Sequence, residues 1–195
     1  MRKDILTSVL AVIVFTVLCG LVYPLAVTGV SQVAFNNAAN GSQIEQDGKV
    51  VGSRLIAQSF EGRRDYFQPR PSQTEYNPAG TYFNNAGPNN KDTRDLIAGN
   101  VRSYLALEGR FNPGLAASNV PVDAVTGSAS GVDPHISTKN AEIQARRIAT
   151  VRNLPIPTVS RLIDDNTDGR FLGLLGEPGV NVLELNLALD KESSR

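Results

Sequence analysis

The chain has 195 residues, and its 19 basic and 19 acidic residues give a formal net charge of zero at pH 7. A balanced charge does not indicate a nucleic acid or an acidic lipid surface as partner. The single cysteine, Cys19, lies in an apolar run and the single histidine is His135. An intramolecular disulfide, a paired-cysteine metal or redox site and a multi-histidine metal centre are therefore excluded.

An uncharged, mostly apolar run occupies residues 5–30. As a helix it would extend roughly 39 Å, more than the ~30 Å hydrocarbon core of a bilayer. A cleaved signal peptide would have a shorter apolar region and a small-residue cleavage site, whereas Tyr23 and Pro24 stand where that site would fall. A buried core helix would be amphipathic. We expect residues 1–4 to be a cytoplasmic N-terminus, 5–30 a transmembrane helix and 31–195 one domain.

Positive charges predict the orientation of this helix. Arg2 and Lys3 precede the run, and the next basic residue after it is Lys49. Because basic residues favour the cytoplasmic side, we expect a single-pass protein with residues 31–195 on the outer, periplasmic face.

Within the run, three- and four-residue spacings place Thr16, Gly20, Tyr23, Pro24 and Val27 on one side of a helix. Thr16 and Gly20 form a small-xxx-small pair, which lets a neighbouring helix come close. This face is a candidate docking surface, and the alternative is that small residues are scattered in a lone anchor.

The domain begins with a predicted hairpin and a long loop. Asp47 and Gly48 favour a tight hairpin turn between two extended segments. Residues 60–90 contain four prolines, which exclude a long helix or a central strand. This loop also holds most of the aromatic side chains of the domain, and it either binds a partner or covers the sheet with its rings. They include Tyr66, Phe67, Tyr76, Tyr82 and Phe83.

Residues 91–108 have a helical pattern that ends before Gly109, with one face formed by Ile97, Val101, Tyr104 and Leu105. Residues 138–153 predict a second helix, with its buried side at Ala141, Ala145, Ile148 and Ala149 and its outward side at Glu142, Arg146 and Arg152. The adjacent Arg146 and Arg147 suggest a solvated basic face or a partner contact.

A short helix is predicted at residues 158–165. For residues 181–190 both strand and helix fit, and we prefer helix because Asn181 and Glu184 have capping-box spacing. We expect an α+β domain.

Residues 120–137 allow three interpretations. The first is a phosphate-binding loop, which is not supported because the GxxxxGK[ST] pattern is absent. A hydrolase would use Ser128 or Ser130 with His135 and Asp123, although no GxSxG elbow is present. We prefer a compact loop in which carboxylates and hydroxyls bond nearby amides, with Ser137 capping the next helix.

Five segments in this order carry a resemblance: YPLAVTG, GSRLIAQSF, YFQPRPS, VPVDAVTGSASGVDPHIS with AEIQARRIATVR, and LGEPGVNVLELNLALD. Together they resemble the C subunit (KdpC) of Kdp-type potassium-transporting P-type ATPases over nearly the whole chain. The resemblance implies an accessory, non-catalytic subunit of a high-affinity potassium import complex in a bacterial or archaeal inner membrane.

The resemblance also implies partners and cofactors. The partners are a channel-like K⁺-translocating subunit, a P-type catalytic subunit, a small single-span subunit and membrane lipid. ATP, Mg and K⁺ would be handled by those partners, and this chain would bind no cofactor itself. The DKTGT phosphorylation motif is absent, so the chain alone should not be an ATPase.

In such a complex we expect the anchor face and a set of outer-domain residues to contact partners: Tyr66, Phe67, Arg70, Asp123, Ser128, Asp133 and His135. The family has been proposed to promote nucleotide binding, but an external domain could not touch cytoplasmic ATP, so a role in assembly or K⁺ entry is expected instead. The sequence departs from the family at Ala129, where a glycine is usual, and in residues 81–85. Rival readings are an exported, membrane-anchored hydrolase and a free binding module.

Overall fold

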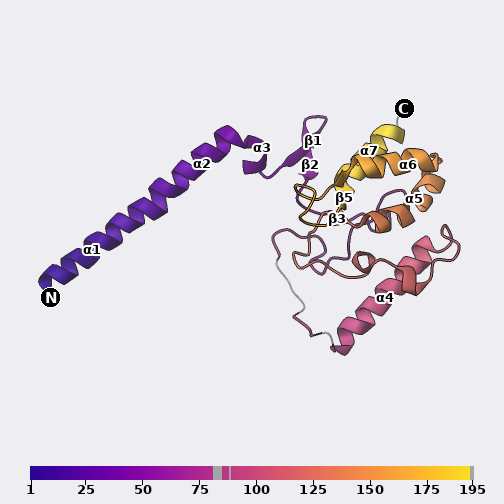
Figure 1. The fold of residues 1–195 in the computed structure, drawn as a ribbon, viewed down its shortest axis with the longest axis horizontal. Helices are drawn as coiled ribbons and strands as arrows, with labels where there is room; N and C mark the ends of the chain where they lie inside the picture. The colour runs from indigo at the N-terminus through magenta and orange to yellow at the C-terminus, as the bar shows by residue number, and fades with distance from the viewer. Residues whose placement is uncertain (81–84, 88, 194–195) are drawn as a thin grey trace. The chain divides into compact units, whose positions relative to one another are not determined.

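The computed structural model describes residues 1–80, 85–87 and 89–193. The chain divides into two compact units, Met1–Val51 and Gly52–Arg195. The first unit is dominated by one continuous helix, Arg2–Ala34, which is long and apolar enough to cross a membrane (Figure 1). It comprises α1 (Arg2–Val17), a π-helical turn (Leu18–Val22) and α2 (Tyr23–Ala34). The predicted long apolar helix is therefore confirmed.

The first unit continues with α3 (Asn36–Ala39) and the strand β1 (Gln43–Gln46), which pairs with β2 (Lys49–Ser53). The intervening Asp47 and Gly48 have φ values of +52° and +72°. Two successive residues with positive φ form the tight hairpin turn that Asp-Gly favours. The predicted hairpin is confirmed.

The second unit is a mixed helix and sheet domain, as expected. Its helices are α4 (Lys91–Glu108), α5 (Thr138–Arg152), α6 (Ile156–Asp165) and α7 (Val182–Ser193), with 3₁₀ turns at Ala117–Asn119 and Val122–Ala124. Its strands are β3 (His135–Ile136), β4 (Thr167–Asp168) and β5 (Gly179–Asn181). They form an antiparallel sheet in the order β3-β5-β4. Figure 1 shows α5, α6 and α7 grouped beside the sheet, with α4 at the edge of the domain.

Local side chains explain where these helices begin. Ser137 Oγ accepts a hydrogen bond from Asn140 N at 3.2 Å, which confirms the predicted cap of α5. Asn181 ends β5 and its Oδ1 accepts from Glu184 N at 3.1 Å, so the ambiguous C-terminal segment is a helix from Val182. The helix α6 begins at Ile156, two residues before the predicted start, because a first helical turn accommodates Pro157 without needing its N–H.

The core lies between α5, α6, α7 and the sheet. Its fully buried or nearly buried apolar side chains come from each of these elements and from the long loop: Phe67, Ile136, Ala141, Ala145, Ile148, Ala149, Val159, Leu162, Ile163, Val180, Val182, Leu185 and Leu189. The predicted buried side of α5 is confirmed. By contrast, the predicted apolar face of α4 is only half-buried.

Two arginines of α5 contradict the predicted outward basic face. Arg147 has no exposed side-chain surface, and its Nε donates to Glu108 Oε1 at 2.8 Å across an equally buried ion pair. Arg152 is 10% exposed, with its Nε donating to Asp65 O at 2.7 Å. Arg146 alone is exposed. The prediction was wrong for Arg147 and Arg152 because their partners lie far away in the sequence.

Arg147 also fixes the long loop. It donates to Arg64 O, to Tyr66 O at 3.0 Å and to Gln144 Oε1 at 3.0 Å. Burial raises the pKa of Glu108, and the positive charge of Arg147 opposes this effect. One buried guanidinium thereby joins the end of α4, the loop and α5.

The loop has no helix or strand in its described part, as predicted. Side-chain amides make the hydrogen bonds to the loop backbone that a neighbouring strand would otherwise make. Asn186 accepts from Phe67 N at 2.9 Å and donates to Phe67 O at 3.0 Å, and Gln144 does the same for Gln68 at 2.7 and 3.1 Å. The predicted loop aromatics Tyr82 and Phe83 lie outside the described residues.

Removing the Arg147 side chain should destabilise the domain strongly. Arg147→Ala leaves Glu108 as an uncompensated buried carboxyl group, and we expect a loss of about 3–5 kcal/mol in the free energy of unfolding. Urea unfolding of the full chain in detergent, followed by tyrosine fluorescence, measures it. The matched control is the exposed neighbour, Arg146→Ala, which should change stability by less than about 0.5 kcal/mol. Equal effects of the two variants would contradict the role given to Arg147.

Candidate functional site

A continuous network of alternating acidic and basic side chains joins the sheet to the surrounding loops. It starts at α7, where Glu184 Oε2 accepts from Arg54 Nε at 3.0 Å. Arg54 Nη2 reaches Asp168 Oδ1 of β4 at 2.7 Å. Asp168 Oδ2 lies 3.0 Å from His135 Nε2 of β3. We call the six residues Glu184, Arg54, Asp168, His135, Asp133 and Arg70 the charge network.

The other half of the network runs from His135 to the long loop. His135 Nδ1 lies 3.7 Å from Asp133 Oδ1, and the His135 backbone N–H donates to the same oxygen at 3.0 Å. Asp133 Oδ2 accepts from Arg70 Nη1 at 3.0 Å. Of the predicted site residues, the structure thus brings Arg70, Asp133 and His135 together.

The sheet register explains how His135 reaches Asp168 across an intervening strand. His135 pairs with Asn181, and Asp168 pairs with Gly179, so β5 separates them. A Cβ at Gly179 would lie 3.2 Å from His135 Cβ and 3.4 Å from its Cγ. The absent side chain of Gly179 therefore leaves the space in which the imidazole lies.

The electrostatics of the network favour the imidazolium form of His135. Interaction with the Asp133 carboxylate raises the pKa of His135, partial burial opposes this, and Asp168 adds to the rise. The pKa of Asp133 is lowered, first by its hydrogen bond with His135 and also by Arg70, while burial opposes the shift. A positive ring is stabilised by both carboxylates, through a hydrogen bond from Nε2 to Asp168 and through the charge of Asp133 beside Nδ1.

Arg70 links the network to the small-residue loop at 120–137. Its Nη2 donates to Gly127 O at 3.1 Å, while Ser72 Oγ donates to Gly131 O at 2.6 Å. Tyr76 Oη donates to Arg70 O at 2.9 Å, and burial raises the pKa of Tyr76 to about 12, so it remains a donor at neutral pH. The two loops therefore form one structural unit.

Two clefts of about 600 and 820 Å³ are both lined by Pro71, Ser72 and residues of α4. The larger one is also lined by Leu96, Val125 and residues of the small-residue loop. A groove beside a half-buried helix is a surface on which a polypeptide can dock.

Ser128 and Ser130 bond to each other and to the loop backbone. Their hydroxyl oxygens lie 3.1 Å apart, and they accept from Gly131 N at 3.0 Å and Val132 N at 3.2 Å respectively. Asp123 accepts from Ser137 N and Oγ, each at 2.8 Å, at the start of α5. The local hydrogen bonding that we preferred for this loop is present. Ala129 has no positive φ, so the missing family glycine causes no backbone strain.

The hydrolase alternative is not favoured by this geometry. The hydrogen bonds of both serines go to each other and to backbone amides, and the ring of His135 faces two carboxylates. Asp123, the third member of the imagined triad, bonds to Ser137 and Asn140 instead. A nucleophile needs a base within hydrogen-bond reach, and no such pair involves these serines.

Tyr66 and Phe67 support the loop from inside the domain. Phe67 has no exposed surface and packs in the core. Tyr66 Oη donates to Asp190 at 2.8 to 2.9 Å. The guanidinium groups of Arg63 and Arg152 lie 4.2 and 4.6 Å from the centroid of its ring. The partner contacts expected of the outer-domain residues stay a prediction.

On the apolar helix, Thr16 and Gly20 line a shallow groove with four neighbours: Ala11, Val12, Phe15 and Cys19. Pro24 lacks an N–H, and its ring conflicts with the carbonyl group four residues earlier. The π turn resolves this conflict, with Tyr23 N donating to Leu18 O. Tyr23 and Pro24 are not among the residues that line this groove.

Comparison with known proteins decides the family. The family model described as "KdpC: K+-transporting ATPase, c chain" matches residues 5–191. The chain belongs to the KdpC family. A protein named potassium-transporting ATPase KdpC subunit from Mycobacterium tuberculosis (strain H37Rv) is 50% identical over 193 residues, covering 98% of this chain and 100% of that protein. A protein of the same name from Caldanaerobacter subterraneus is 44% identical, and the match covers 98% of this chain and 97% of that protein. Another from Bradyrhizobium diazoefficiens is 43% identical, and the match covers the full length of both chains.

Membership of the KdpC family makes this chain a subunit of a K⁺-transporting ATPase, as the sequence segments indicated. Among the described residues no group of three or more His, Cys, Asp or Glu side chains is arranged to hold a metal ion. Sequence reasoning missed Arg54, Asp168 and Glu184 as members of the charge network. Arg54 and Glu184 lie within family-like segments, and Asp168 carried no signal.

The charge network predicts a pH dependence of stability for this KdpC-family domain. His135 has an ordinary pKa of 6.5 that is raised on folding. Its contribution is therefore complete below pH 6.5 and is lost as pH rises through the higher folded-state value. Urea unfolding between pH 5.5 and 8.5 should show a falling free energy of unfolding in the wild type and a flatter profile in His135→Gln. Since His135 is the single histidine, an unchanged slope in the variant would contradict this assignment.

Proposed function

We propose that this chain is an accessory, non-catalytic subunit that assembles and stabilises the ATP-driven K⁺ import complex of its family. The observation that carries the proposal is the family match over residues 5–191, which includes both the apolar helix and the domain. The partners in this proposal are a channel-like K⁺-translocating subunit, a P-type catalytic subunit and a small single-span subunit. Those partners would handle ATP, Mg and K⁺.

The proposed topology has a cytoplasmic N-terminus, one crossing of the inner membrane by the Arg2–Ala34 helix, and the domain on the outer face. Arg2 and Lys3 at one end of the helix support this orientation. On the outer face the domain would act near K⁺ entry and would have no access to cytoplasmic ATP.

The proposed docking elements are the groove at Thr16 and Gly20, with Tyr23 and Pro24 beyond the π turn, and the loop face of the domain. The loop face combines the half-exposed Arg70, Asp133 and His135 with the two clefts beside Pro71 and Ser72. Its backbone is held by Arg147, Gln144 and Asn186. A pre-ordered surface loses less entropy on binding, which suits an assembly role.

Filling the groove of the helix should weaken assembly. Gly20→Leu places a branched side chain where a neighbouring helix would come close. We expect roughly tenfold less co-purifying partner protein when the tagged chain is isolated in mild detergent from cells expressing the whole operon. The amount of each subunit is measured by mass spectrometry.

The matched control is Gly29→Leu, since the space around both helical glycines is open and Gly29 lies outside the groove. It should retain the complex. Recovery of the wild-type chain alone, at full length and in the membrane, would overturn the proposed function. Equal loss in both glycine variants would contradict the assignment of the groove.

A further inference from the structure

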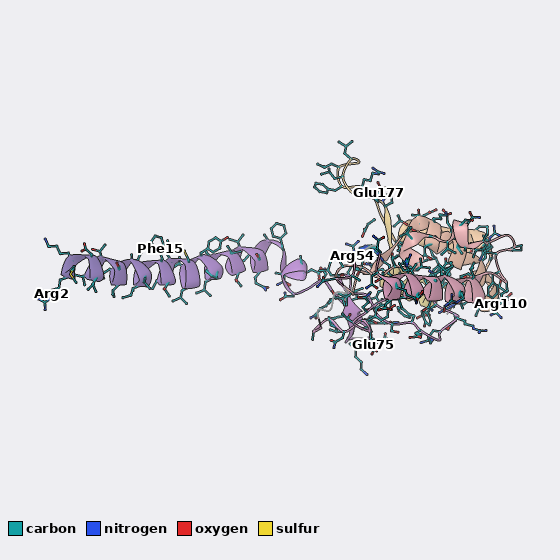
Figure 2. All side chains as sticks on the ribbon, turned by 90° about the horizontal axis from the view of Figure 1, so that it is seen from below. Arg2, Phe15, Arg54, Glu75, Arg110 and Glu177 are labelled. Atoms are coloured by element: carbon teal, nitrogen blue, oxygen red, sulfur yellow. The ribbon has the colours of Figure 1, made fainter. Side chains whose placement is uncertain are left out.

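The connection between β4 and β5 exposes four large apolar side chains in a row. Phe171, Leu172, Leu174 and Leu175 are 68%, 78%, 80% and 62% exposed. We call residues 170–177 the apolar finger. Figure 2 shows Glu177, at its base, where this loop projects away from the rest of the domain. An exposed apolar patch of a few hundred Å² often marks an interaction site.

The finger is an ordered turn whose backbone bonds internally. Phe171 N donates to Leu175 O at 2.8 Å, and Leu175 N and Leu174 N donate back to Phe171 O at 3.0 and 3.2 Å. At its base Arg170 pairs with Glu177 at 2.7 Å. Because the N–H groups of Phe171, Leu174 and Leu175 already have partners, placing the tip in an apolar environment costs less desolvation than for an open loop.

Leu172 has a backbone conformation that is unfavourable for a leucine. Leu172 and Gly173 have φ values of +52° and +74° at the centre of the turn. Glycine or asparagine is favoured at both central positions of such a turn, and a leucine there is strained. The chain therefore keeps an apolar side chain at a position that is unfavourable both for its backbone and for its exposure to water.

We propose that the apolar finger inserts into an uncharged, apolar pocket on another subunit of the K⁺-transporting ATPase. This inference rests on the proposed function and adds a specific anchor to it. The charges near the finger in the sequence argue against a lipid surface as its binding partner. The segment from Ser160 through Glu184 contains five acidic residues and two arginines, and it has no lysine, tryptophan or tyrosine. A membrane-surface tip would carry basic and amphipathic aromatic residues instead.

The size of the finger argues against a second copy of this chain. A stable interface buries about 800 Å² on each partner, more than four side chains at one tip can supply. A small anchor suffices when another attachment already holds the partners together, because tethering raises the effective concentration. The apolar helix provides that attachment in the proposed complex.

One double variant separates folding from docking. Leu172→Asn with Leu174→Ser replaces the strained leucine by a residue that tolerates positive φ, so the thermal midpoint of the chain should stay equal or rise. Co-purification of the other subunits from cells expressing the whole operon should fall roughly tenfold. The matched control is Val122→Ser, at a site 74% exposed on the same domain, and it should retain the complex. Full retention in the double variant would overturn the proposal.

Crosslinking from the finger identifies the molecule that it contacts. In a Cys19→Ser background, Leu174→Cys carrying a maleimide photocrosslinker should attach to one apolar segment of another subunit, and Val122→Cys should not. If the complex stays intact but the crosslinker attaches only to lipid, only to a second copy or to nothing, the proposed docking role of the finger is overturned. The proposed function would still stand. A wild-type chain that brings down no other subunit would instead overturn both.

Discussion

The buried ion pair between Arg147 and Glu108 is the constraint on which the domain depends. A guanidinium with no exposed surface must have its charge neutralised and its donors satisfied, and here the neutralising carboxylate and most of the acceptors come from outside its own helix. The carboxylate comes from the end of α4, and two carbonyl groups come from the loop at Arg64 and Tyr66. The end of α4 and the loop are thereby both fixed to α5.

With its first part fixed in this way, the loop can deliver Arg70 to the small-residue loop and to Asp133. The network then continues through His135 and Asp168 across the sheet, in a gap that Gly179 leaves open. These contacts tie the loop, the small-residue loop and the sheet together. The sequence-predicted residues Asp123, Ser128 and His135 each make hydrogen bonds within the domain.

Features that depend on neighbours along the chain were predictable from the sequence. The apolar helix followed from its length, the hairpin from Asp47 and Gly48, and the start of α5 from Ser137. The burial of Arg147 was not predictable, because Glu108 lies 39 residues away and the loop carbonyls more than 80. The apolar finger was missed for a different reason: leucines between two short strands are typical of a core, and local patterns do not indicate which apolar segment stays exposed.

We propose that this KdpC-family chain acts from the outer face of the membrane, and site-specific labelling tests this topology most directly. In a Cys19→Ser background, Glu142→Cys places a thiol on the exposed side of α5, and Lys3→Cys places one at the N-terminal end of the apolar helix. A membrane-impermeant maleimide applied to intact spheroplasts should label Glu142→Cys and should reach Lys3→Cys only after lysis. The opposite pattern would put the domain in the cytoplasm and contradict the account.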